Sequence, residues 1–208
     1  MLTVKFDGIK KAVISACDDI IGRELELSAL DSFVGDGDHG VTVRKGYQKV
    51  KDSIISENPK TMGALLFEGG MALADTTGGA IGPILASMFI GFSTSVGEKE
   101  ELSVSDLSEM FESGLLSVQD LGGAKPGDCT MVDALYPFVQ SLKNTDETDV
   151  LSALNIACEK AFEGSENTKN LIPKLGRARN LGEKAIGYID AGSRSMYYFL
   201  KAFSDNIE

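Results

Sequence analysis

The chain has 208 residues, of which 43% are hydrophobic and 25% are charged, and it carries a net charge of −11 with a pI near 4.6. This composition is typical of a packed globular protein and excludes a largely disordered one, while the negative charge argues against nucleic acid and membrane surfaces as partners. We therefore expect one domain, residues 1–208.

Apolar residues recur with a period near 3.6 along most of the chain, whereas alternation of period two is almost absent. The separators between these periodic stretches are short and mostly contain glycine, so we expect antiparallel neighbours in a bundle or barrel, with ligands at one end. The prediction is an all-α fold of about eight amphipathic helices. Their expected ranges are 3–27, 41–56, 61–74, 80–96, 104–121, 130–143, 148–163 and 192–205.

Several helix ends carry chemical signals. Ser103 and Thr148 are expected N-caps, and Pro59 follows the end of the second helix. Residues 164–191 form the longest stretch without a clear helix, and a loop of that length is uncommon unless it has a function. We expect a lid or binding loop there, with a short helical turn inside it.

The cysteines and the N-terminus indicate a compartment. Cys17, Cys129 and Cys158 lie far apart and in no CxxC arrangement, which argues against a disulfide framework or a zinc site. The N-terminal residues MLTVKFDGIKK have no basic segment followed by an apolar run, and the apolar stretch 80–92 is shorter than the ~20 residues that span a bilayer. We expect a cytoplasmic protein without membrane contact.

Three glycine-rich loops each end where a predicted helix begins. They are DSFVGDGDHG (31–40), TTGGAIGP (76–83) and GGAKPGDCT (122–130). A helix N-terminus presents unpaired N–H groups, and glycine lets an anion approach the backbone closely, so such loops favour phosphate binding. The alternative is that the glycines only form turns between helices.

The first loop does not fit the common glycine-rich motifs. Its glycines match GxGxxG, but that fingerprint needs a preceding strand, and two aspartates inside the turn would repel a pyrophosphate. An EF-hand register fails because Tyr47 or Phe33 stands where a ligand is required. No GxxxxGK[ST] is present, which excludes a P-loop.

The remaining pattern in this loop is D-x4-D-x-D, formed by Asp31, Asp36 and Asp38. Crowded carboxylates repel one another unless a cation or solvent relieves the repulsion. Oxygen ligands without cysteine suit Mg²⁺ rather than zinc. The loop therefore predicts a magnesium site, the alternative being an Asx-rich surface turn.

One histidine and several arginines complete the candidate chemistry. His39 is the sole histidine, and we expect it to donate an N–H to a phosphate or a ligand carboxylate rather than to act as a base or phosphoryl carrier. Arg177, Arg179 and Arg194 place guanidinium groups in or next to the suspected lid, where they could bind phosphate. The alternative for these arginines, and for Lys125 and Asp128, is an ordinary loop salt bridge.

Four motifs, in their order along the chain, resemble those of a known family. They are DxxxxGDGDHG, GGAIGP, KPGDCTMVDAL and GRARNLGEKAIGYIDAGSRS. They are similar to motifs of the nucleotide-binding (L) subunit of dihydroxyacetone kinase and of the C-terminal domain of the single-chain, ATP-dependent kinases. The resemblance covers nearly the whole chain and implies an antiparallel barrel of eight amphipathic helices.

The resemblance also implies a site. Asp31, Asp36 and Asp38 would hold two Mg²⁺ ions that bridge the phosphates of ADP or ATP, and with Arg177 they would form the catalytic groups. Gly122 and Met131 would lie near the adenine and the ribose. The full set of implied nucleotide contacts is His39, Gly40, Val41, Thr42, Gly79, Ala80, Ile81, Gly122, Met131, Arg177, Asp190, Ala191 and Gly192.

The partners follow from the same resemblance. A separate K-type subunit would hold dihydroxyacetone covalently through a histidine, and a phosphohistidine protein would recharge the bound ADP. Transfer of a phosphoryl group from the Mg-bound nucleotide needs positioning and charge neutralisation more than a protein base. Homodimerisation is left open.

Four positions depart from the family pattern. Ile81 replaces a common serine, Thr42 an asparagine, Cys129 a lysine or similar polar residue, and Ala191 a proline. Two alternatives therefore stay open: a paralogous subunit for another short ketose, such as a tetrulose, and a non-catalytic nucleotide-binding regulator. Phosphate hydrolysis by this chain alone is a third and weaker one.

Overall fold

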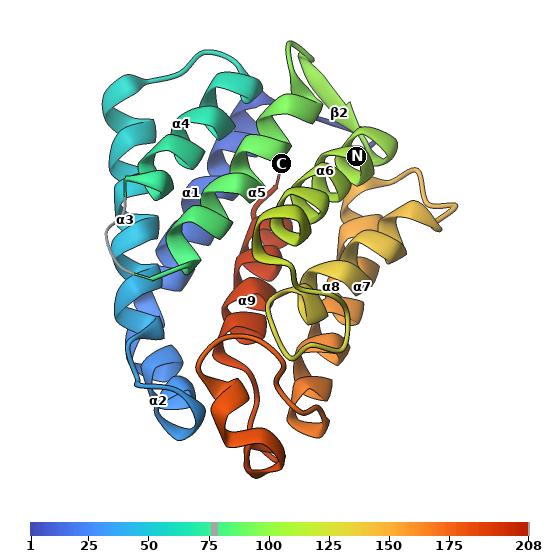
Figure 1. Cartoon of the computed structure of the whole chain (residues 1–208). Helices are drawn as coiled ribbons and strands as arrows, with labels where there is room; N and C mark the ends of the chain where they lie inside the picture. The colour runs from blue at the N-terminus through green and yellow to red at the C-terminus, as the bar shows by residue number, and fades with distance from the viewer. Residues whose placement is uncertain (76–78, 208) are drawn as a thin grey trace.

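The computed structural model describes residues 1–75 and 79–207, and most of these are helical (Figure 1). The predicted all-α class is confirmed. The α-helices are α1 (Phe6–Gly22), α2 (Glu24–Val34), α3 (His39–Glu57), α4 (Met62–Ala74), α5 (Ile81–Val96), α6 (Val104–Gly122), α7 (Val132–Lys143), α8 (Val150–Asn167) and α9 (Ala191–Asp205). Two 3₁₀ helices, η1 (Thr168–Asn170) and η2 (Ala178–Ala185), lie between α8 and α9.

The helices contact one another in a cyclic order. From α3 to α9 each helix packs on the next one in the sequence, and α1 packs on both α3 and α9. Figure 1 shows α9 running beside α1 and α8, although α1 and α9 lie at opposite ends of the chain. This is the order of neighbours expected for a barrel. Helix α2 lies outside this order and packs on α3 and α9.

Aromatic rings fill the space between helices. Phe111 of α6 packs edge to face against Phe92, Phe138 and Phe203, with ring centroids 5.2, 4.8 and 5.5 Å away. Phe199 continues the contacts along α9, and all five side chains are buried. We call these five residues the aromatic core, because they join α5, α6, α7 and α9.

One of the two predicted N-caps is correct. Ser103 accepts a hydrogen bond from the Asp106 N–H at 3.3 Å, and the Asp106 carboxylate accepts one from the Ser103 N–H at 2.9 Å, which is a complete capping box. The predicted N-cap at Thr148 is wrong for α8. Asp149 caps that helix instead, because its carboxylate accepts the Ser152 N–H at 2.9 Å.

The single helix predicted for residues 3–27 is wrong. Residues Thr3–Lys5 form strand β1, which pairs antiparallel with β2 (Glu101–Ser103), and α1 ends at Gly22. Arg23 has φ −100° and ψ 14°, and its N–H bonds Ile20 O, so the helical hydrogen bonding stops there. Buried apolar residues occur on both sides of this break, so the periodicity did not reveal it.

The other helix boundaries lie within about four residues of the prediction, and two of the differences matter for the site. Helix α3 begins at His39 rather than at residue 41, and α8 continues to Asn167. The expected loop 164–191 is therefore shorter, and the short helical turn expected inside it corresponds to η1 and η2. Within the described part of the chain, no helix is both long and apolar enough to cross a membrane.

Candidate functional site

A cavity of about 610 Å³ lies where the glycine-rich loops and segment 175–192 meet. This volume is in the range of small-molecule sites, roughly 300–1,000 Å³. Most of the site residues implied by the sequence line it: Asp31, Asp36, Asp38, His39, Thr42, Gly79, Ala80, Ile81, Gly122, Met131, Arg177, Asp190, Ala191 and Gly192. Gly40 and Val41 are not among the lining residues. Residues 76–78 of the second loop lie outside the described part of the chain.

The three aspartates come together because a helix ends between them. Asp31 lies in the last turn of α2, not in a loop as predicted, and the Gly35 N–H bonds the Asp31 carbonyl at 2.6 Å. Gly37 then takes φ +76°, a left-handed conformation that favours glycine. The chain turns there into α3, which places Asp36 and Asp38 beside Asp31.

The donor set of this aspartate triad (Asp31, Asp36 and Asp38) fits a hard divalent cation. One carboxylate oxygen from each residue lies within 4.8 Å of the other two. Two ionised carboxylates at this separation repel by roughly 3 to 4 kcal/mol at an effective dielectric constant of 20. Mg²⁺ prefers oxygen ligands of this kind, so the residues present could hold it.

The triad already has a positive neighbour. The Arg177 guanidinium forms an ion pair with Asp36, and its Nη1 lies 3.2 Å from Asp38 Oδ2. Arg179 lines the same cavity. Two of the three arginines singled out in the sequence therefore face the site.

His39 begins α3 and is held by two contacts. Its backbone N–H bonds Asp31 Oδ2 at 3.3 Å, and its Nε2 lies 2.9 Å from Ser195 Oγ. Burial of the ring lowers the pKa of His39 to about 4, which the Asp31 charge only partly offsets, so the ring is neutral near pH 7. With the Ser195 hydroxyl donating to Gly192 O at 3.0 Å, the tautomer that fits this geometry has Nε2–H donating to Ser195 Oγ. In this arrangement the neutral ring has no second N–H. The sequence-based expectation requires such an N–H, because it has His39 donate to a phosphate.

Gly40 has a packing role that sequence reasoning missed. A Cβ at this position would lie 2.1 Å from Glu24 O and 2.7 Å from Ser28 N, both in the backbone of α2. Only glycine therefore allows α3 to approach α2 this closely. Since Asp31 lies on α2, Gly40 helps to set where the triad forms.

Two aspartates organise the loop between α6 and α7. Asp133 accepts the N–H groups of Gly127 and Thr130 at 2.6 and 2.8 Å, and Asp128 accepts the Lys125 N–H at 2.8 Å. Asp128 is also paired with Lys174 at 2.8 Å, which lowers the pKa of that carboxyl. Asp128 therefore connects this loop to segment 168–190 through a salt bridge, which is the alternative given for it in the sequence analysis. Asp133 lies in the quoted motif KPGDCTMVDAL, but no role is predicted for it from the sequence.

Cys129 lies in the same loop and faces the cavity. It has φ +60°, uncommon for a residue other than glycine, and its thiol lies 3.6 Å from Thr168 O. Burial raises the pKa of the Cys129 thiol to about 12. A thiol with that pKa stays protonated near pH 7 and is a poor nucleophile.

Helix α9 starts at the wall of the cavity. Asp190 is its N-cap and accepts the Ser193 N–H at 2.6 Å, while its own N–H bonds Thr168 Oγ1 at 3.0 Å. Burial raises the pKa of Asp190 to about 7 against the effect of the Ser193 hydrogen bond. These bonds fix Ala191 and Gly192, the first residues of α9, in the cavity wall.

Arg194 does not face the cavity, unlike Arg177 and Arg179. It is 7% exposed, pairs with Glu166, and lies within 6 Å of the ring centroids of Phe162, Tyr197 and Tyr198. The observed contacts of Arg194 therefore match the alternative, a salt bridge, rather than phosphate binding.

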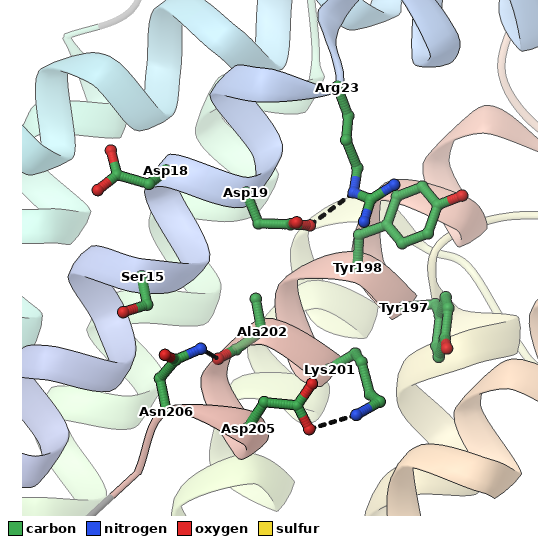
Figure 2. Close-up of a pocket in the computed structure, with 10 residues that line it drawn as sticks. All are labelled: Ser15, Asp18, Asp19, Arg23, Tyr197, Tyr198, Lys201, Ala202, Asp205 and Asn206. Carbon is green, nitrogen blue, oxygen red and sulfur yellow. Dashed lines mark hydrogen bonds and ion pairs between the residues drawn. The ribbon is translucent and has the colours of Figure 1, made fainter.

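A second hollow, of about 430 Å³, lies between α1 and α9 (Figure 2). Its charged side chains all have partners: Arg23 bonds Asp19 at 2.7 Å and lies over the Tyr198 ring, and Lys201 pairs with Asp205. Asp18 pairs with Lys51, which lies outside the hollow. Because these charges are already balanced locally, they do not call for a ligand. The cavity at the aspartate triad is the candidate site.

Comparisons with known proteins bear on this site. The model of the DAK2 domain matches residues 33–205. The chain is 36% identical to PEP-dependent dihydroxyacetone kinase 2, ADP-binding subunit DhaL, of Listeria innocua, over 88% of this chain and 86% of the relative. It is 34% identical to the corresponding ADP-binding subunit DhaL of Escherichia coli, over 90% of this chain and 91% of the relative.

Longer kinases match over one part only. L-erythrulose kinase of Pectobacterium atrosepticum is 34% identical over 94% of this chain, which corresponds to 34% of that relative. The crystal structure of the C. freundii dihydroxyacetone kinase in complex with AMP-PNP and Mg²⁺ superposes with a TM-score of 0.72 and 27% identity. That match covers 93% of this chain and 33% of the kinase, so the chain spans about a third of such proteins.

Proposed function

Because the chain belongs to the DAK2 domain family, we propose that it is the ADP- or ATP-binding subunit of a dihydroxyacetone kinase. Its relatives are kinase subunits that bind ADP, and they match it over most of their length. The observation that carries the proposal is the aspartate triad at the wall of a cavity large enough for a nucleotide.

In this proposal each part of the cavity has a role in holding the phosphates. Asp31, Asp36 and Asp38 hold two Mg²⁺ ions, which supply positive charge against the phosphate oxygens when bound. Among the residues that the structure describes, no side-chain hydrogen bond caps the N-terminus of α5, so its first N–H groups, at Ala80 and Ile81, are available to an anion.

Arg177 adds a mobile charge to these fixed donors. Its guanidinium can pair with a phosphate in two parallel hydrogen bonds. Thr42, Gly79, Gly122, Met131 and the Asp190–Gly192 start of α9 form the remaining wall around the nucleotide. In this cavity wall the chain provides binding and charge rather than a protein base, which agrees with a neutral His39.

The acceptor and the donor come from other proteins in this proposal. Dihydroxyacetone is held on a separate K-type subunit in the cytoplasm, and a phosphohistidine protein recharges ADP without its release. The similar subunits belong to PEP-dependent dihydroxyacetone kinases, which supports this form. The match to a third of the longer kinases supports a division of labour between two proteins.

Isothermal titration with ADP, with and without Mg²⁺, tests the proposal. We expect micromolar binding that requires Mg²⁺, and we expect Asp36→Ala to abolish it while the helical circular dichroism stays unchanged. Asp146→Ala, which removes an exposed aspartate from another loop, is the charge-matched control. Failure of the unmodified protein to bind ADP with Mg²⁺ would contradict the proposal.

A second acceptor deserves a direct test because an erythrulose kinase is among the similar proteins. The purified chain is mixed with a K-type subunit and a phosphoryl source, and the phosphate esters of dihydroxyacetone and erythrulose are measured. Faster formation of the erythrulose ester identifies a kinase subunit for a four-carbon ketose.

A further inference from the structure

Arg177 binds two of the three carboxylates that a metal ion would need. Its guanidinium pairs with Oδ2 of Asp36 and with Oδ2 of Asp38, and both residues belong to the triad described above. A guanidinium and a divalent cation repel each other, and the two cannot occupy the same carboxylate lone pairs at the same time. The two cations therefore compete for one site.

The segment that carries Arg177 is fixed at its base. Thr168 Oγ1 accepts the Asp190 N–H at 3.0 Å, and the Gly187 N–H bonds Lys169 O at 2.7 Å, so the two ends of segment 168–190 are held together. Lys174 adds a further tie to Asp128. The path of the chain into and out of the segment is set by these bonds.

The middle of the segment is held over the triad by exposed contacts. Arg177 has a side chain that is 58% exposed. Tyr188 stacks on Phe33 of α2 with ring centroids 5.2 Å apart, and these residues are 43% and 61% exposed. Exposed ion pairs and ring contacts are weak, so a competing ligand can break them.

Gly176 forms the backbone turn that leads into Arg177. It precedes Arg177, has φ +65°, and a Cβ there would meet no atom within 4 Å. The glycine is thus required by the backbone turn and not by packing. Because no atom packs against this side of Gly176, a change of backbone direction before Arg177 meets no steric barrier there.

We propose that Arg177 is an exchangeable counter-ion of the aspartate triad. In the metal-free protein it neutralises Asp36 and Asp38 and holds the middle of segment 168–190 across the cavity. A divalent cation displaces it, and the freed guanidinium turns to the nucleotide phosphates. The inference rests on the proposed metal site and adds an order, in which metal binding precedes the contact between Arg177 and phosphate.

Exchange predicts effects of opposite sign at one residue. Without nucleotide, loss of Arg177 removes a competitor, so metal binding becomes tighter. With metal present, loss of Arg177 removes a phosphate contact, so nucleotide binding becomes weaker. An arginine that contacted only the nucleotide would weaken nucleotide binding when removed and leave metal binding unchanged. Only a residue that interacts with both ligands changes the affinity for both.

Titration with Mn²⁺ in the absence of nucleotide, followed by electron paramagnetic resonance of the free ion, tests the exchange. Mn²⁺ prefers the same oxygen ligands as Mg²⁺. We expect Arg177→Gln to bind Mn²⁺ roughly fivefold more tightly than the unmodified protein, the upper range for loss of one exposed ion pair. Arg177→Lys keeps the charge and should stay near the unmodified value.

Arg179→Gln is the matched control, because Arg179 lines the same cavity and removing it changes the overall charge equally. We expect it to change Mn²⁺ affinity by less than about twofold. Calorimetry with ADP at saturating Mg²⁺ supplies the second sign, where Arg177→Gln should bind ADP roughly tenfold more weakly, as for a lost charged hydrogen bond.

Amide hydrogen exchange gives a readout that does not depend on activity. Mg²⁺ alone should speed exchange of residues 175–182 in the unmodified protein, because it breaks the Arg177 ion pairs. The same addition should leave exchange in Arg177→Gln unchanged.

Two results would overturn the exchange. One is equal Mn²⁺ affinity in Arg177→Gln and the unmodified protein, and the other is an equal gain in Arg179→Gln, which would show a general charge effect. If Mg²⁺-dependent ADP binding persists in either case, only the exchange is wrong. If the unmodified protein binds neither Mn²⁺ nor ADP, the exchange and the proposed function are both wrong.

Discussion

The aromatic core and the aspartate triad are built on opposite physical terms. In the core, buried rings such as Phe111 touch rings from three other positions, so the chain gains free energy from every contact. At the triad, three carboxylates lie within 4.8 Å of one another, so the folded chain holds a repulsion that a cation relieves. Stability is concentrated in one region and ligand affinity in the other, and mutations should separate them.

The largest expected effect is in the core. Phe111→Ala removes the ring that contacts Phe92, Phe138 and Phe203, and should lower the free energy of unfolding by about 4 kcal/mol. Denaturant unfolding measures this loss, and ADP calorimetry on the folded protein should show an unchanged affinity. If the fully folded variant bound ADP more weakly, stability and ligand affinity would not be separate properties of the two regions.

Gly40→Ala should lower both stability and ligand affinity, because the packing of Gly40 against α2 sets the position of Asp31. The new Cβ would press on Glu24 O, and α2 must move away with Asp31, at about 2 kcal/mol of unfolding free energy. We expect weaker Mg²⁺-dependent ADP binding as well. Gly22→Ala is the control, because a Cβ there meets no atom within 4 Å. Equal behaviour of the two variants would show that Gly40 is not under packing constraint.

A carboxylate far from the site should affect stability alone, in a way that depends on pH. Partial burial would raise the pKa of Asp106, but hydrogen bonds from Lys99 and Ser103 lower it to about 2. Since the folded pKa lies below the unfolded value near 4, the carboxylate stabilises the protein above about pH 4, and this is lost as pH falls toward 2.

Asp106→Asn should therefore cost about 1 kcal/mol near pH 7 and almost nothing near pH 2. Thermal unfolding at several pH values measures the difference between the variant and the unmodified protein. A difference that stays constant across this range would assign the effect to helix capping rather than to charge.

The smallest expected effect concerns the hydrogen bond between His39 and Ser195. Ser195→Ala removes the acceptor of the His39 Nε2–H and should cost about 0.5 kcal/mol of unfolding free energy. The freed ring N–H would then be available to a phosphate, so ADP affinity should not fall. A clear loss of ADP affinity would show that Ser195 orients His39 for binding.

The sequence predicted local features well because local features leave local patterns. The 3.6-residue period identified most helices, and the spacing of Asp31, Asp36 and Asp38 identified the triad before any geometry was known. The break at Arg23 was missed because apolar residues continue through it. Asp31 was assigned to a loop because glycines follow it closely, although it lies in α2.

Long-range ties could not be predicted in the same way. The bond between Thr168 and Asp190 joins residues 22 positions apart, and Asp128 is paired with Lys174 at a separation of 46. Serines, threonines and aspartates of this kind look like ordinary loop residues in a sequence. The family resemblance implies a phosphate contact at Gly40. Glycine permits both close packing and anion approach, and the packing role becomes visible only from the neighbouring backbone.

The closed base of segment 168–190 has a consequence for how such proteins diversify. The hydrogen bonds of Thr168 with Asp190 and of Gly187 with Lys169 define where α8 ends and α9 begins, whatever path the chain takes between them. Lengthening a flexible loop between fixed ends costs little free energy. Residues 171–186 can therefore change in length, or be exchanged for the matching segment of a related kinase, without displacing α8 or α9.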